Sequence, residues 1–261
     1  MQNNNVLLKL ENVSKSFGEV RALQNVNLEI YNHEIVGLVG GNGAGKSTLI
    51  KIISGVLRPD KGKIYLDGKE ITLSGPAQAL KLGIYTVHQK MEEMLALHHS
   101  VAANIFMGEE LEKPLIPFMP WPKILDKRAM DKEALQLLKK LGLEMDSVRQ
   151  PVVGCSGGQR QATALAKVLK RRPRLLLLDE PTAALGVKEK YQVLRLIKRV
   201  GREEGISIII VSHNLEEICE IVDRIIVLRN GTVVGECVPG VDVKERIVQL
   251  IVGAEATKDV R

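Results

Sequence analysis

The chain has 261 residues, of which 45% are apolar and 26% charged, so it can bury a sizeable core in one large domain or two small ones. Aromatic residues make up only 3%, which argues against a base-stacking nucleic-acid platform, and the net charge of +6 is compatible with nucleotides or an anionic membrane without specifying either. Cys155, Cys219 and Cys237 are too scattered for a disulfide framework or a zinc site and fit a reducing cytosol.

No segment predicts a membrane anchor. The N-terminal Met-Gln-Asn-Asn-Asn lacks the basic and apolar regions of a signal peptide, and no run approaches the ~20 apolar residues that cross a bilayer. If the protein acts at a membrane, we expect another chain to supply the membrane part.

Strands and helices alternate along most of the chain. Residues 6–30 alternate apolar and polar side chains as antiparallel strands do, and Asp67-Gly68 and Asn230-Gly231 are strong hairpin signals. Spacing and short apolar runs predict helices over 76–82, 127–141, 188–204, 214–222 and 243–252, and strands over 84–88, 174–178 and 207–211. This alternation indicates an α/β fold with a parallel core.

Residues 40–48 read Gly-Gly-Asn-Gly-Ala-Gly-Lys-Ser-Thr between an apolar run and a helical segment, which favours a phosphate-binding loop over a glycine-rich turn with a stray lysine. The glycines would let the backbone fold closely around a triphosphate and aim its N–H groups inward. Lys46 would reach the β- and γ-phosphates, and the Ser47 hydroxyl would hold Mg²⁺. The predicted nucleotide-binding residues of this loop are Gly40, Gly41, Asn42, Gly43, Ala44, Gly45, Lys46, Ser47 and Thr48.

Two further patterns point to nucleotide chemistry. Residues 174–180 form an apolar strand ending in carboxylates; Asp179 would hold Mg²⁺ through water and Glu180 would polarise the attacking water, although carboxylates often merely end strands. Residues 155–159 begin a second helix, with Ser156 as N-cap and glycines that expose N–H groups. One triphosphate does not need two such helix ends from one chain, so we expect a head-to-tail dimer.

Over nearly its whole length the chain resembles the ATP-binding-cassette (ABC) family. Residues 40–48 are similar to its Walker A loop and residues 175–179 to Walker B, with Glu180 in the place of the catalytic glutamate. The residues that resemble the family's signature sequence are Ser156, Gly157, Gly158 and Gln159. The resemblance also implies roles that the residues alone do not indicate: Gln89 contacts Mg²⁺ and the water, His213 contacts the γ-phosphate, and Phe17 stacks on adenine.

The family resemblance implies a RecA-like P-loop core with an N-terminal antiparallel β-subdomain and an inserted α-helical subdomain. We expect one nucleotide-binding domain over 1–261, with the core in 1–88 and 173–240, the mostly helical signature subdomain in 89–172, and a C-terminal helix and tail in 241–261. The surface that docks a permease is expected in residues 90–104.

Two positions depart from the family pattern. Cys155 stands where the signature usually has leucine; the anion contacts of Ser156 and Gly158 should survive, but a helix N-terminus could lower the thiol pKa and make it sensitive to thiol reagents. Gly186 ends the D-loop where aspartate is usual and cannot make the carboxylate contact across the dimer, which bears on coupling between two ATP sites.

The resemblance implies an ATP-hydrolysing subunit of a bacterial importer, because phrases such as Tyr85-Thr-Val-His-Gln and Ser156-Gly-Gly-Gln-Arg-Gln-Ala are similar to ribose-, xylose- and fructose-type monosaccharide importers. It implies ATP and Mg²⁺ as ligands, a dimer with an identical or related cassette, a separate transmembrane permease and, indirectly, an extracytoplasmic solute-binding protein. No nucleic-acid partner is expected. The resemblance implies that the protein lies peripherally on the cytoplasmic face of the bacterial inner (cell) membrane. Two alternatives stay open: a non-transport ABC ATPase of translation, DNA or iron–sulfur assembly, and an importer for a non-sugar solute such as amino acids.

A proline-rich segment, residues 114–122, reads Pro-Leu-Ile-Pro-Phe-Met-Pro-Trp-Pro. Pro114, Pro117 and Pro120 have the three-residue period of a polyproline helix. It is expected to be a stiff strap that packs its apolar side on the helical subdomain, with contact to a membrane partner and a peptide-ligand role as alternatives.

Overall fold

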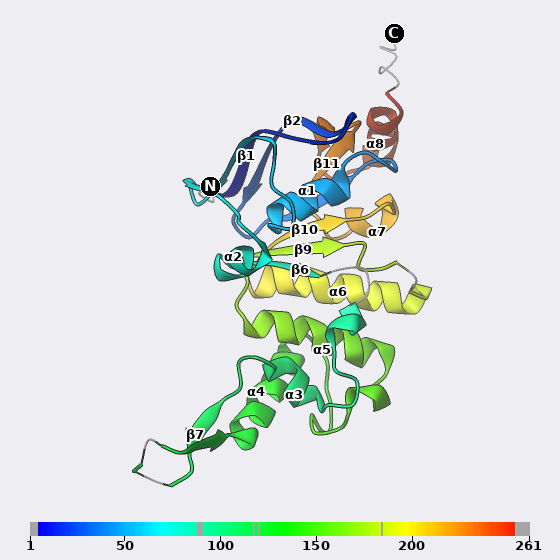
Figure 1. The fold of residues 1–261 in the computed structure, drawn as a ribbon. Helices are drawn as coiled ribbons and strands as arrows, with labels where there is room; N and C mark the ends of the chain where they lie inside the picture. The colour runs from blue at the N-terminus through cyan, green and yellow to red at the C-terminus, as the bar shows by residue number, and fades with distance from the viewer. Residues whose placement is uncertain (1–4, 88–90, 117, 120, 184, 254–261) are drawn as a thin grey trace. The chain divides into compact units, whose positions relative to one another are not determined.

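The computed structural model describes residues 5–87, 91–116, 118–119, 121–183 and 185–253 (Figure 1). They pack as two compact units, the first within residues 1–89, 174–183 and 197–261 and the second within residues 90–173 and 184–196. Helix α6, Val187–Glu203, contributes to both units. No described helix combines the length and the apolar character that crossing a bilayer requires.

A six-stranded sheet forms the centre of the first unit. Its order is β12-β11-β3-β10-β9-β6; all neighbours run parallel except β12, which is antiparallel to β11. Every residue of β3 and β10 is buried, as expected of parallel strands inside a sheet. The strands are β3 Ile35–Val39, β6 Ile84–Val87, β9 Leu175–Asp179, β10 Ser207–Val211, β11 Arg224–Arg229 and β12 Thr232–Cys237. The predicted parallel α/β core is confirmed.

The first unit also holds a four-stranded antiparallel sheet of order β2-β1-β4-β5. Both predicted hairpin turns are confirmed, because Asp67 and Gly68 have φ of 50° and 73°, and Asn230 and Gly231 have φ of 47° and 77°. Apolar side chains of both sheets and of α1 share one buried core. The strands are β1 Val6–Phe17, β2 Val20–Tyr31, β4 Lys61–Leu66 and β5 Lys69–Ile71.

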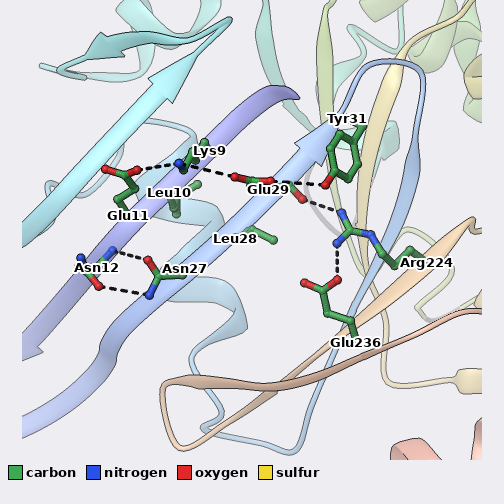
Figure 2. A pocket seen from close by; sticks show the side chains of 10 residues that line it. All are labelled: Lys9, Leu10, Glu11, Asn12, Asn27, Leu28, Glu29, Tyr31, Arg224 and Glu236. Atoms are coloured by element: carbon green, nitrogen blue, oxygen red, sulfur yellow. Dashed lines mark hydrogen bonds and ion pairs between the residues drawn. The ribbon is translucent and has the colours of Figure 1, made fainter. Parts of the chain in front are cut away.

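Arg224 at the start of β11 ties the two sheets of the first unit together (Figure 2). Its guanidinium donates to Glu34 at 2.9 Å and to the Glu29 carbonyl at 2.6 Å, pairs with Glu236, and lies 5.3 Å from the centre of the Tyr31 ring. Burial acts to lower the pKa of Arg224, but the hydrogen bonds to the two glutamates outweigh it and raise the pKa. The hollow beside Arg224, about 540 Å³, is lined by side chains that largely satisfy one another, so we assign it a structural role.

The helices lie close to their predicted positions. The first unit holds α1 Lys46–Ile53, α2 Pro76–Lys81, α7 Leu215–Cys219 and α8 Val243–Val252, and the second holds α3 Val101–Phe106, α4 Lys127–Lys140 and α5 Gly157–Lys170. Short 3₁₀ turns cover Met91–Met94 and Val152–Gly154. α7 is shorter than predicted because the chain turns after Cys219. The Asp223 N–H then donates to the Ile35 carbonyl, and β11 begins beside β3 at the next residue.

The prediction of a polyproline strap over residues 114–122 is wrong at Phe118, which has φ of 69°, and Pro117 and Pro120 lie outside the described residues. Strands β7, Glu112–Pro114, and β8, Lys123–Leu125, form an antiparallel hairpin within the second unit. Phe118 and Trp121 are 106% and 75% exposed, so these two aromatic side chains do not pack on the helices. The three-residue proline period did not reveal this, because it carries no information about which strand pairs with which.

Candidate nucleotide-binding and catalytic site

The predicted phosphate loop connects β3 to α1. β3 ends at Val39 and α1 begins at Lys46, which confirms the strand–loop–helix context. Gly45 occupies the N-cap position with φ of 103°, and its carbonyl accepts the first helical bond from Leu49 at 2.9 Å. A Cβ at this position would lie 2.6 Å from the Ala22 carbonyl, so only glycine fits. The loop therefore starts a helix without a capping side chain, which suits binding of an anion.

Lys46 is held inside the loop. Its ammonium donates to the carbonyls of Gly40 and Gly41, each at 2.9 Å. Burial lowers the pKa of Lys46, and the negative charges of Glu180 and Asp179 oppose this effect. The structure thus brings the predicted phosphate-binding lysine and the two predicted carboxylates within electrostatic reach of one another.

The strand register explains why these groups meet. Val211 at the end of β10 lies opposite Asp179 on β9 and opposite Leu38 on β3. Because β3, β10 and β9 are parallel neighbours, the segments that follow them emerge at the same edge of the sheet. This edge carries the phosphate loop, His213 and the Asp179–Glu180 pair.

Glu180 and His213 are in direct contact. The Nδ1 atom of His213 lies 3.2 Å from Oε1 of Glu180. Glu180 has φ of 50°, an unfavourable backbone conformation for a glutamate, and its N–H donates to the Val211 carbonyl at 3.0 Å. A non-glycine residue kept in this conformation at the end of a core strand is typical of a functional position.

The oxygen ligands at this edge fit Mg²⁺. Ser47 is exposed in the first turn of α1, and Asp179 and Glu180 are both partly buried near the single ammonium of Lys46. Mg²⁺ prefers hard oxygen ligands, and the hydroxyl of Ser47 and the carboxylate of Asp179 are of this kind. Gln89, the remaining predicted metal contact, lies outside the described residues.

The remaining predicted residues of the first unit differ in exposure. Phe17 ends β1 and is 48% exposed, with the Lys15 ammonium 5.7 Å from its ring centre, so part of the ring is open to a ligand. Asn42 and Gly43 are exposed, whereas Ala44 is buried. Gly41 and Thr48 are half-buried.

The signature residues lie in the second unit, at the start of α5. Ser156 is the N-cap: its Oγ accepts from the Gln159 N–H at 3.3 Å, and the Gln159 side chain accepts from the Ser156 N–H at 2.9 Å. This reciprocal capping box confirms the predicted N-cap. Gly157 and Gly158 form the first turn of the helix.

The expectation of a reactive Cys155 is wrong. The side chain is buried, and Sγ faces the Gln150 amide at 3.7 Å. Burial raises the pKa of the Cys155 thiol, which outweighs the favourable charge of Arg160. Cys155 therefore behaves as a small apolar residue and not as an activated thiol.

One residue beside the signature was not predicted. The Glu189 carboxylate accepts from the Gly186 N–H at 3.1 Å. The other oxygen of Glu189 lies 3.2 Å from where a Cβ on Gly157 would be, so the carboxylate lies against the signature turn. The signal in the sequence was a glutamate three residues after Gly186, at the start of a helix. Glu189 brings a carboxylate to the D-loop glycine from the same chain.

A family model described as ABC transporter matches residues 23–183. The chain belongs to the ABC transporter family. The match runs from β2 past the Asp179–Glu180 pair and includes the phosphate loop and the signature, whereas His213 lies after it.

Curated ABC proteins similar to this chain are named for sugar import. A fructose import ATP-binding protein of Rhizobium meliloti is 42% identical over 86% of this chain and 85% of its own length. A xylose/arabinose import ATP-binding protein of Sulfolobus acidocaldarius is 39% identical over 87% of this chain and 86% of its own. A ribose import ATP-binding protein of Rubrobacter xylanophilus is 39% identical over 95% of this chain, which spans only 47% of that protein.

Solved ABC cassettes share the fold. The cbiO1 cassette of Clostridium perfringens, part of an ABC transporter complex, superposes with a TM-score of 0.77 at 29% identity, over 97% of this chain and 96% of that one. A dimeric ABC cassette in a post-hydrolysis state with ADP and Pi has a TM-score of 0.68 at 28% identity, over 90% of this chain and 100% of that one. The predicted ABC ATPase fold is confirmed.

Proposed function

We propose that this chain is the ATP-hydrolysing subunit of an ABC importer whose solute is a monosaccharide. The observation that supports hydrolysis is the convergence of Lys46, Asp179, Glu180 and His213 at one edge of the parallel sheet. The sugar class is supported by relatives at 36–42% identity that are named for fructose, ribose and xylose/arabinose import.

Each residue would have a separate task. The Lys46 ammonium would exchange the Gly40 and Gly41 carbonyls for phosphate oxygens, and the uncapped start of α1 would receive them. Glu180 would orient the attacking water, with His213 fixing the carboxylate and reaching the γ-phosphate. Mg²⁺, held by Ser47 and Asp179, would neutralise charge on the phosphates.

The signature residues would act on a second nucleotide. We propose a dimer with an identical or related cassette, in which Ser156, Gly157, Gly158 and Gln159 close over the partner's γ-phosphate. Phe17 would stack on adenine. A separate permease would dock on residues 90–104 of the helical subdomain, an extracytoplasmic solute-binding protein would act indirectly, and the chain would lie on the cytoplasmic face of the cell membrane.

The hydrolysis proposal is tested with Glu180→Gln. We expect steady-state ATP turnover to fall at least about 100-fold while ATP binding is retained, because the amide cannot act as the base. Glu245→Gln, which changes an exposed glutamate in the first turn of α8, is the matched control and should keep turnover. Multiple turnover by Glu180→Gln at the wild-type rate would refute its role.

The importer proposal is tested by mass spectrometry of proteins that copurify with this chain from gently solubilised native membranes. A polytopic permease is the expected partner, and its solute-binding protein can then be screened against sugars. Recovery only with ribosomal, DNA or cluster-assembly proteins would contradict the importer and leave the ATPase standing.

A further inference from the structure

The tip of the β7–β8 hairpin exposes apolar side chains in the part of the chain that the structure describes. The hairpin tip consists of Leu115, Ile116, Phe118, Met119 and Trp121, all exposed. Ile124 and Leu125 on β8 are exposed as well. In Figure 1 the hairpin extends beyond α4 of the same unit. A contiguous apolar surface of this kind marks an interaction site more often than an ordinary surface loop.

The base of the hairpin is held in place. Glu112, Lys113 and Pro114 pair with Leu125, Ile124 and Lys123. The Leu115 N–H donates to the Pro122 carbonyl at 2.8 Å, so the pairing continues beyond the strands. Asp126 caps α4 through the Ala129 N–H at 3.2 Å and also accepts from Lys113 at 3.2 Å, which anchors the hairpin to its helix.

The tip has few backbone donors to satisfy. Residues 114–122 number nine, and four of them are prolines without an N–H: Pro114, Pro117, Pro120 and Pro122. Of the five N–H groups that remain, those of Leu115 and Met119 already donate inside the hairpin, at 2.8 and 3.1 Å. An unpaired amide is costly in an apolar medium, so this composition reduces the cost of leaving water.

Two observations favour a lipid surface over a protein groove. A sheet edge that takes up an extended segment gains affinity from main-chain hydrogen bonds, and this tip offers few N–H groups. A groove for proline-rich segments binds the polyproline conformation, whereas Phe118 has φ of 69° and the Met119 N–H donates back to the Ile116 carbonyl at 3.1 Å. Residues 114–122 also carry no charge. Lys113 and Lys123 flank them and pair with Asp126 and Glu112, at 3.2 and 3.4 Å.

Cations also lie next to the base of the hairpin. Lys127 and Arg128, at the start of α4, are exposed. An uncharged aromatic tip with lysine and arginine nearby matches the headgroup region of a bilayer, where tryptophan is enriched and long basic side chains reach polar groups.

We propose that the hairpin tip inserts into the headgroup region of a phospholipid bilayer, with Trp121 and Phe118 as its anchors. This proposal does not depend on ATP hydrolysis or on the identity of the solute. It gives the cassette a contact with the membrane that is separate from any permease.

Trp121 is the single tryptophan of the chain, so its fluorescence reports on the tip directly. The full chain is mixed with vesicles of phosphatidylcholine alone and with vesicles that also contain phosphatidylglycerol. We expect a blue shift of emission, and quenching by lipids brominated on their acyl chains, with both compositions. Unchanged emission with both would overturn the proposal, as would binding only to phosphatidylglycerol vesicles without acyl-chain quenching, which would indicate the lysines alone.

The double variant Phe118→Ser/Met119→Ser keeps the reporter. We expect its cosedimentation with phosphatidylcholine vesicles to fall about tenfold, and Val241→Ser, at a 99% exposed apolar residue outside the hairpin, to behave as wild type. Equal losses in both variants would contradict a specific role of the tip. If the emission of Trp121 shifts only when a copurified membrane protein is present, and not with vesicles, the tip binds a protein partner. That result would overturn the lipid proposal.

Discussion

Glycines stand at the start of α1, in the phosphate loop, and at the start of α5, in the signature, and these two helix starts are built differently. Gly45 starts α1 in a left-handed conformation and offers no capping group. Ser156 starts α5 with a full capping box, in which Ser156 and Gln159 each satisfy the other's N–H. The start of α1 leaves its backbone N–H groups to a ligand. At the start of α5, two backbone N–H groups already donate to side chains of the same helix start.

The glycines also serve different purposes. At Gly45 a side chain is excluded by backbone, because a Cβ would lie 2.6 Å from a carbonyl oxygen. At Gly157 and Gly158 the nearest atoms are the ends of the Glu189 and Gln192 side chains, at 3.2 and 3.0 Å. Backbone atoms therefore enclose Gly45, whereas the signature turn lies beside the side-chain ends of two α6 residues. In the proposed dimer each ATP would need both helix starts, the phosphate loop of one chain and the signature of its partner.

The largest effect should come from the phosphate loop. Lys46→Ala removes the ammonium that would bind the β- and γ-phosphates, and a charged hydrogen bond of this kind contributes about 1.5–3 kcal/mol, so we expect ATP affinity to fall roughly 10- to 100-fold or more. Calorimetric titration with ATP measures this. Lys51→Ala, an exposed lysine on the same helix, should bind normally. Wild-type affinity of Lys46→Ala would remove the basis of the loop assignment.

Two alanine substitutions separate close approach from backbone conformation. Gly45→Ala combines a positive φ with the clash at the Ala22 carbonyl, and we expect a loss of about 3 kcal/mol in unfolding free energy. Gly43→Ala has φ of 75° and no atom within 4 Å of the added Cβ, so only about 1 kcal/mol should be lost. Urea unfolding midpoints give the comparison. Equal midpoints for the two variants would mean that packing around Gly45 is not what fixes the loop.

The signature cap can be tested against an ordinary cap in the same unit. Ser156→Ala and Ser100→Ala each remove an N-cap hydroxyl, from α5 and α3, and each should cost about 1 kcal/mol of stability. Only Ser156→Ala should weaken ATP-dependent dimerisation, which is measured by size exclusion in a Glu180→Gln background. If both variants dimerise alike, the signature serine has a structural role alone.

The fold could be predicted from the sequence where local pattern determined it. Helices over 127–141 and 243–252 and the strand over 207–211 follow from periodicity, and the structure has them at Lys127–Lys140, Val243–Val252 and Ser207–Val211. The prediction for residues 114–122 was wrong, because the proline period describes one segment alone, whereas the hairpin depends on pairs such as Glu112 with Leu125 and Pro114 with Lys123.

The site residues that lie on sequence motifs were predictable, and one that depends on a tertiary contact was not. Lys46, Asp179 and Glu180 lie on motifs with a physical rationale, and the structure brings them together. Glu189 was missed, because its importance comes from a contact between the α6 side chain and the signature turn that no local spacing encodes.

The smallest effect concerns Cys155, which lies just before the signature cap. Burial raises the pKa of its thiol above the ordinary value of 9.0, so the thiolate, which is the reactive form, stays scarce at neutral pH and grows more abundant as the pH rises toward the raised pKa. Cys219 and Cys237 are half-buried with thiol pKa values also raised by burial. Mass-spectrometric mapping of iodoacetamide labelling from pH 7 to 10 should find Cys155 modified last. If Cys155 is instead labelled first at pH 7, the helix dipole activates the thiol after all, and the self-capped start of α5 is more open than its hydrogen bonds indicate.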